Sequence, residues 1–97
     1  MAREPDRRIT LLDFWAEWCG VCRLIDPVVA RIARAASDLD LRKIDVAEHP
    51  DLARERNVAS LPTLVFVGPD GRELKRIGGA LSGRKIEQAL AEARAAL

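Results

Sequence analysis

Two cysteines are the side chains of this 97-residue chain that are best suited to covalent chemistry. Cys19 and Cys22 lie in the segment Trp-Cys-Gly-Val-Cys, which separates an apolar run from a helical pattern. We expect Cys19 at the beginning of that helix, where unpaired backbone N–H groups and the helix dipole stabilise the thiolate that attacks a disulfide. Cys22, one turn further on and more covered, would be the resolving thiol that attacks the mixed disulfide and releases the partner.

A metal-binding interpretation of the two cysteines is open at this point. A pair at this spacing can supply half of a zinc site. The sequence lacks a second pair of such ligands, and His49, the only histidine, lies in the polar stretch Glu-His-Pro, which is typical of a solvated loop. Two thiolates and one distant imidazole make a poor tetrahedral set, so the pattern favours redox chemistry without a metal.

An acidic residue interrupts the apolar run that leads to the cysteines. Asp13 stands between Leu-Leu and Phe-Trp, where a buried carboxylate is costly unless it is paired or protonated. General-base service to Cys22, directly or through a water, would explain this position. Lys43, in a neighbouring predicted strand, could be the partner of Asp13. The alternative is that Asp13 lies at a strand edge with its carboxylate in solvent.

Hydrophobic periodicity predicts the elements that position these residues. The apolar run at 10–16 is typical of a strand covered on both faces, and the helical pattern after the cysteines contains Pro27. In chain order we expect strand 10–16, helix 21–36, strand 39–46, a short helix 50–56, an antiparallel hairpin of strands 63–67 and 72–77, and a last helix that Ser82 caps. This order predicts an α/β fold, with a central four-stranded mixed sheet flanked by three helices.

Composition excludes several classes of function. A length of 97 residues predicts one domain over 1–97, and 48% apolar with 32% charged residues is the composition of a globular protein. We expect residues 1–8 to form a flexible or edge-guarding N-terminus. A formal net charge of +1 gives no electrostatic reason for a nucleic-acid or membrane partner. The chain shows neither a signal-peptide pattern nor an apolar stretch near the roughly 20 residues of a spanning helix, so we expect a cytoplasmic protein.

Several motifs in the correct order resemble the thioredoxin family. The motifs are Asp-Phe-Trp-Ala-Glu-Trp-Cys-Gly-x-Cys at 13–22, Pro27, Lys43, Leu-Pro-Thr-Leu at 61–64 and Gly-Ala-Leu-Ser at 79–82. The resemblance extends from about Leu11 to the C-terminus and implies a thioredoxin-like fold. Such a chain would reduce protein disulfides by dithiol-disulfide exchange.

The resemblance implies a role for each residue of the redox centre. Cys19 would be the nucleophile and Cys22 the resolving thiol. Asp13 would be the buried acid that moves the proton of Cys22, and Lys43 would correspond to the lysine near that acid. Pro62 would correspond to the family's cis-proline, whose ring lies against the disulfide.

The resemblance also implies a docking surface for the substrate. In the family, the backbone just before the cis-proline, here Leu61, pairs with an extended substrate segment. The other docking residues would be Trp18, Gly20, Val21, Gly79 and Ala80. A Trp18 that is packed in the core is an equally open interpretation, and Trp15 has the position of packing support.

The resemblance implies partners as well. Disulfide-containing proteins would be the substrates, a thioredoxin-reductase-like protein would donate the electrons, and the Cys19–Cys22 pair would need no cofactor. One alternative is a non-catalytic thioredoxin-like module that binds partners or senses redox state. Another is a disulfide oxidase or isomerase.

The sequence departs from the family at two places. Gly20 and Val21 stand where the family usually has Gly-Pro, and the N–H of Val21 loosens the first helical turn, so we expect a redox potential different from that of a Val21→Pro variant. The family also has a strand and a helix before the Asp-Phe-Trp strand, where only about ten residues stand here. Strand 39–46 would then be an edge, either guarded by the N-terminal residues or used for self-association, with Lys43 pointing inward.

Overall fold

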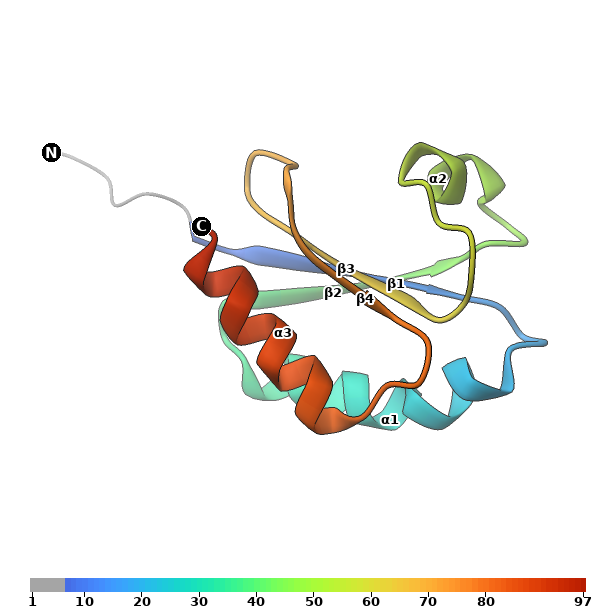
Figure 1. The fold of residues 1–97 in the computed structure, drawn as a ribbon, viewed down its shortest axis with the longest axis horizontal. Coiled ribbons are helices and arrows are strands. Elements are labelled where there is room, and N and C mark those ends of the chain that lie inside the picture. Colours follow the sequence, from blue (N-terminus) through green and yellow to red (C-terminus); the bar gives the residue numbers. More distant parts are fainter. Residues whose placement is uncertain (1–6) are drawn as a thin grey trace, which may run out of the picture.

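Four strands and three helices make up the part of the chain that the computed structural model describes, residues 7–97 (Figure 1). In chain order they are β1 (Ile9–Trp15), α1 (Gly20–Ala35), β2 (Leu39–Asp45), α2 (Pro50–Glu55), β3 (Thr63–Val67), β4 (Glu73–Gly78) and α3 (Gly83–Ala95). The predicted order of elements and the α/β class are confirmed. Ser82 caps α3 as predicted, because its hydroxyl accepts a hydrogen bond from the N–H of Lys85 at 3.2 Å.

The strands form one mixed sheet in the order β2-β1-β3-β4. β1 pairs in parallel with β2, as the strand–helix–strand order requires, and Asp13 lies opposite Lys43 in this pairing. β3 is antiparallel to both β1 and β4. The central position of β1 explains its almost continuous apolar sequence, because both of its faces are covered.

Each face of the sheet has its own hydrophobic core. Alternate residues of β1 point to opposite faces, so Leu11 packs with α1 and α3, while Leu12 and Phe14 pack with apolar residues of α2. Figure 1 shows this arrangement, with α1 and α3 on one side of the sheet and α2 on the other. Asp13 shares the face of Leu11 and is therefore directed toward the helix that carries the cysteines.

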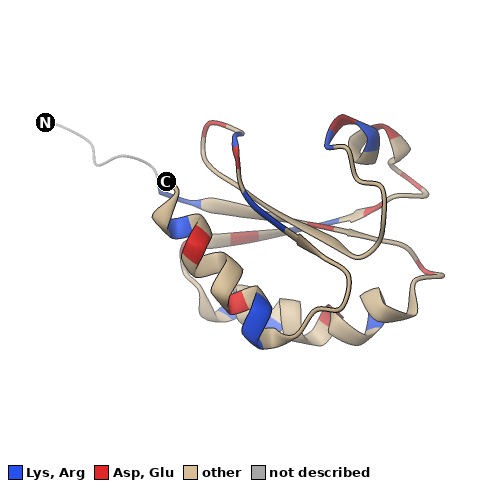
Figure 2. Ribbon diagram, viewed as in Figure 1, with Lys and Arg blue, Asp and Glu red and all other residues tan. Residues whose placement is uncertain are grey.

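Charged side chains lie mainly on the outer surfaces of these layers. Figure 2 shows both acidic and basic residues on α2 and on α3, in keeping with the near-balanced charge of the sequence. In the described part of the chain, no helix is both long enough and apolar enough to cross a membrane.

β2 forms one edge of the described sheet, as the sequence predicts. The guanidinium of Arg8 hydrogen-bonds to the carboxylate of Asp40 on this strand and donates to the carbonyl of Ser37 at 3.2 Å. The expectation of a guarding or flexible N-terminus falls mostly on residues 1–6, which lie outside the described residues. Self-association through 39–46 stays a prediction.

Candidate active site

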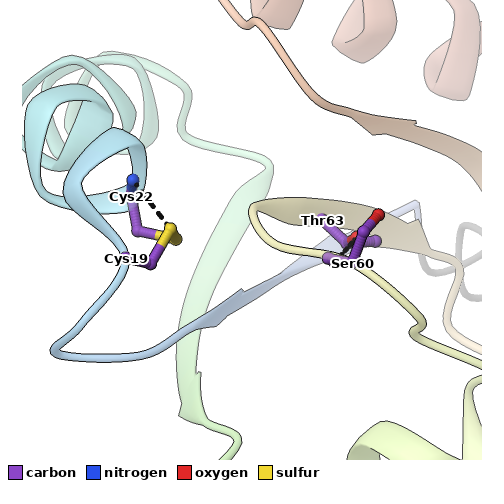
Figure 3. The surroundings of a disulfide bond; sticks show 4 residues. All are labelled: Cys19, Cys22, Ser60 and Thr63. Atoms are coloured by element: carbon purple, nitrogen blue, oxygen red, sulfur yellow. Dashed lines mark hydrogen bonds between the residues drawn. A yellow bond between two sulfur atoms is a disulfide. The ribbon is translucent and has the colours of Figure 1, made fainter.

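The two cysteines lie at the beginning of α1 and are joined by a disulfide, with their Cα atoms 5.3 Å apart (Figure 3). Cys19 is the N-cap residue of the helix, and its backbone is extended. Its Sγ accepts a hydrogen bond from the backbone N–H of Cys22 at 3.2 Å. In the reduced protein the same position presents the sulfur of Cys19 to the free N–H groups and the positive end of the helix dipole, which stabilise a thiolate.

Burial does not distinguish the two cysteines in the oxidised state. Cys19 is 7% exposed and Cys22 is 5% exposed. Cys22 was expected to be the more buried of the two, and the difference is small. The chemical difference between them is their place on the helix, since Cys19 precedes the first turn and Cys22 lies within it. This difference favours Cys19 as the thiol that ionises first.

Asp13 is buried in the centre of the sheet, with 3% of its surface exposed. The alternative of a strand-edge carboxylate in solvent is therefore wrong. Burial is the main reason that the pKa of Asp13 is raised to about 6. The positive charge of Lys43 lowers this pKa, and the negative charge of Asp26 raises it further. A carboxyl group with such a pKa can exchange a proton near neutral pH, which is what a general base for a thiol requires.

Lys43 does not form an ion pair with Asp13 among the described residues, although the two are opposite each other in the β1–β2 register. Its Nζ lies 2.6 Å from a carboxylate oxygen of Asp26 and 4.9 Å from the centre of the Trp15 ring. The expectation that Lys43 points inward is also wrong, because 40% of its side chain is exposed. Asp26 is a better partner for Lys43 than the buried Asp13, because the Lys43 ammonium stays partly hydrated when it pairs with an exposed carboxylate.

Sequence reasoning missed Asp26 as a member of this region. It follows Cys22 by four residues on α1, so the two side chains share one face of the helix. That spacing is the signal that could have found it. Asp26 places a second carboxyl group near Cys22 and beside Lys43, the residue that was expected to be the partner of Asp13.

The segment before β3 brings one of the predicted docking residues, Leu61, against the cysteines. The Leu61–Pro62 peptide bond is cis, as predicted. Leu61 packs against the small cluster that Ala16 and the two cysteines form. The hydroxyl of Thr63 donates to the carbonyl of Ser60 at 2.6 Å and holds the turn on which this proline lies (Figure 3).

The glycine segment after β4 adjoins the same turn. The N–H of Gly79 donates to the carbonyl of Pro62 at 3.4 Å, and Gly79 adopts a φ of +79°, which favours glycine. Ala80 follows it and is exposed. The structure therefore brings Gly79 next to Pro62, and it is Leu61, on the same turn, that packs against the cysteines.

Trp18 and Val21 are exposed beside the cysteines. Trp18 is 76% exposed and Val21 is 44% exposed, so the interpretation of Trp18 as a core residue is wrong. Gly20 has open space where a side chain would begin. Large apolar side chains at the surface next to a disulfide are suited to contact with a protein partner.

The zinc interpretation lacks ligands within residues 7–97. No group of three or more His, Cys, Asp or Glu side chains lies close enough there to hold a metal ion. His49 is exposed and is the residue that precedes α2. The geometry at the beginning of α1 is that of a dithiol–disulfide pair.

Comparison with known proteins identifies the family. The thioredoxin family profile matches residues 3–92. The chain belongs to the thioredoxin family. A thioredoxin from Mycobacterium tuberculosis is 48% identical over 71 residues, which cover 72% of this chain and 60% of that protein. Thioredoxin H2 from Arabidopsis thaliana is 43% identical over 77 residues, which cover 79% of this chain and 57% of that protein.

Solved thioredoxin structures share the fold. A mutant thioredoxin from Halobacterium salinarum superposes with a TM-score of 0.80 at 32% sequence identity, over 91% of this chain and 77% of that chain. The thioredoxin-like fold predicted from the motifs is thus confirmed. The chain spans about three fifths of the length of the two sequence relatives described above.

Proposed function

We propose that this protein is a thiol:disulfide oxidoreductase that reduces protein disulfides by dithiol-disulfide exchange. The observation that carries the proposal is the Cys19–Cys22 disulfide at the N-terminus of α1, with Cys19 as the N-cap residue. Membership of the thioredoxin family supports it. The pair needs no further cofactor, because the reduced Cys19–Cys22 dithiol itself carries the two electrons that pass to the substrate.

The proposed reaction has two steps. The Cys19 thiolate of the reduced protein attacks a substrate disulfide, which forms a mixed disulfide and releases one substrate sulfur as a thiolate. The Cys22 thiol then loses its proton and attacks the Sγ of Cys19, which forms the Cys19–Cys22 disulfide and releases the second substrate thiolate. Two electrons pass from the protein to the substrate, and the helix N-terminus stabilises the attacking thiolate of the first step.

Asp13 is the proposed base for Cys22. It is directed toward α1 from the adjacent strand, and its raised pKa of about 6 leaves it ionised at neutral pH yet able to hold a proton transiently. Transfer through a water is compatible with this placement. Lys43 contributes by its charge, which opposes the effect of burial on Asp13.

The proposed electron donor is a thioredoxin-reductase-like protein. A relative from Mycobacterium leprae, which is 46% identical over 72 residues, is named a bifunctional thioredoxin reductase/thioredoxin, so a reductase and a thioredoxin are joined in that protein. We also propose a cytoplasmic location, as expected from the sequence, and a part in electron transport, as the resemblance to thioredoxins implies.

Reduction of insulin by dithiothreitol tests the proposed function. We expect the wild-type protein to accelerate the precipitation of reduced insulin chains at catalytic concentration. A wild-type protein that leaves the uncatalysed rate unchanged would instead be a binding or redox-sensing module. A redox potential measured by equilibration with glutathione separates a reductase from an oxidase or isomerase, because a reductase pair has the more negative potential.

Trp18 is expected to contribute to the binding of protein substrates. Replacement by Ala removes an apolar side chain that is 76% exposed beside the disulfide, and it should raise KM for insulin about three- to tenfold with little change in kcat. Trp18→Phe should recover most of the affinity. The control substrate is a small aromatic disulfide, whose reduction Trp18→Ala should leave within about twofold. An unchanged KM for insulin would remove Trp18 from the docking surface.

A further inference from the structure

A surface pocket of about 240 Å³ opens beside Cys22 and is shared by three elements. Trp15 of β1, Lys43 of β2 and three residues of α1, Cys22, Arg23 and Asp26, line it. The pocket connects the resolving cysteine with solvent on the side of the sheet to which Asp13 is also directed. Charged groups at its mouth therefore act on any proton that moves between Asp13 and Cys22.

Two carboxyl groups in this region compete for one ammonium group. Asp13 lies opposite Lys43 in the strand register, but the ion pair of Lys43 is with Asp26 at 2.6 Å. The Trp15 ring lies 4.9 Å from the same Nζ and adds a second attraction in that position. Asp26 and Trp15 together hold the ammonium in the half-exposed pocket mouth, although a buried carboxyl group is its strand neighbour.

We propose that Asp26 is a positioning residue that keeps the ammonium of Lys43 at the pocket mouth and thereby preserves Asp13 as an effective proton acceptor for Cys22. This inference rests on the proposed function and deepens it, since it assigns the control of proton transfer to a residue on the same helix as the cysteines. In this role Asp26 acts through its ion pair with Lys43 and takes no part in the sulfur exchange itself.

The electrostatic environment of Asp13 is consistent with this role. Among the described residues, Lys43 faces it from β2, and Asp26 and Arg23 belong to the α1 side of the pocket. Its partner in β3 is the apolar Leu64. Burial is the main cause of the raised pKa of Asp13, Lys43 lowers that pKa, and Asp26 raises it. Loss of the Asp26 charge would lower the pKa of Asp13 in two ways. It would remove the direct effect of Asp26 on that pKa, and it would free the Lys43 ammonium to move toward Asp13.

The test is a titration of the Asp13 carboxyl group in the oxidised full-length protein, followed by carbon NMR. Asp26→Asn should lower the pKa of Asp13 by about 1 unit, and Asp26→Glu should restore most of the wild-type value. Asp51→Asn is the matched control, because this carboxylate lies on α2, and it should leave the Asp13 titration unchanged.

A double-variant cycle separates the role of Asp26 from a general charge effect. In a Lys43→Met background the ammonium is absent, so Asp26→Asn should shift the pKa of Asp13 by less than half of the shift in the wild type. An equal shift in both backgrounds would show that Asp26 does not act through Lys43 and would overturn the inference. A shift below about 0.2 unit in the Asp26→Asn single variant would overturn it as well.

The kinetic readout distinguishes failure of this inference from failure of the proposed function. In Asp26→Asn, the acidic limb of the pH profile for insulin reduction should move to lower pH by the same amount as the Asp13 titration. An active wild-type protein whose Asp13 does not respond to Asp26 contradicts the inference alone. A wild-type protein that is inactive toward insulin, with an Asp13 that does respond, contradicts only the proposed function.

Discussion

Cys19→Ser is expected to lower the rate of protein-disulfide reduction by at least about a thousandfold. A serine hydroxyl at the same helix N-terminus stays protonated at neutral pH and cannot form a disulfide with the substrate. The remaining Cys22 lies within the first helical turn and lacks the N-cap position that stabilises a thiolate at Cys19, so we do not expect it to replace the nucleophile. The measurement is dithiothreitol-driven insulin reduction, with the uncatalysed rate subtracted.

Cys22→Ser is the matched variant for this prediction. It retains the nucleophile and lacks the thiol that resolves the intermediate, so the mixed disulfide between Cys19 and the substrate should accumulate. Intact-mass analysis under non-reducing conditions detects this adduct. Equal activity of Cys19→Ser and the wild type would contradict the assignment. So would an adduct that accumulates in Cys19→Ser and is absent from Cys22→Ser.

The charge of Asp13 is expected to have a large effect on stability. Its pKa is raised from 3.8 to about 6 in the folded protein, so folding favours the protonated form. The stability that this proton confers is fully present below about pH 4 and is lost as the pH rises through about 6. Above that pH, the buried carboxylate lowers the free energy of unfolding by about 3 kcal/mol relative to a neutral group.

Asp13→Asn isolates this contribution, because the amide is nearly isosteric and does not titrate. The free energy of unfolding of the oxidised wild type, measured in urea, should fall relative to that of the variant by about 3 kcal/mol between about pH 4 and pH 8. The same variant should reduce insulin about 10- to 100-fold more slowly at pH 7, since Cys22 loses its base. A difference in stability that does not change with pH would show that Asp13 is ionised in the fold at no cost.

The sequence predicts the fold well because its signals are local. The apolar run that becomes β1, the helical pattern around Pro27 and the short turn between β3 and β4 each specify one element, and the order of elements fixes the parallel pairing of β1 with β2. Cys19 at the beginning of α1 follows from the same pattern.

The parts of the site that sequence reasoning missed depend on contacts between elements. Lys43 has two carboxyl groups within reach, and only the placement of α1 against β2 shows that Asp26 is the one it pairs with. The exposure of Trp18 was equally undetermined, since a single tryptophan beside a helix start fits the core or the surface. The nearly equal solvent exposure of the two cysteines could also be seen only in the structure.

The proposed reaction depends on a Cys19 sulfur that is ionised at neutral pH because of its position at the N-terminus of α1. The most direct test is the rate of iodoacetamide alkylation of the reduced protein at pH 7, with the modified cysteine located by mass spectrometry. Cys19 should be alkylated first, and at least about tenfold faster than the thiol of an unstructured peptide. Alkylation of Cys19 at the rate of the peptide thiol, or of Cys22 before Cys19, would contradict this prediction.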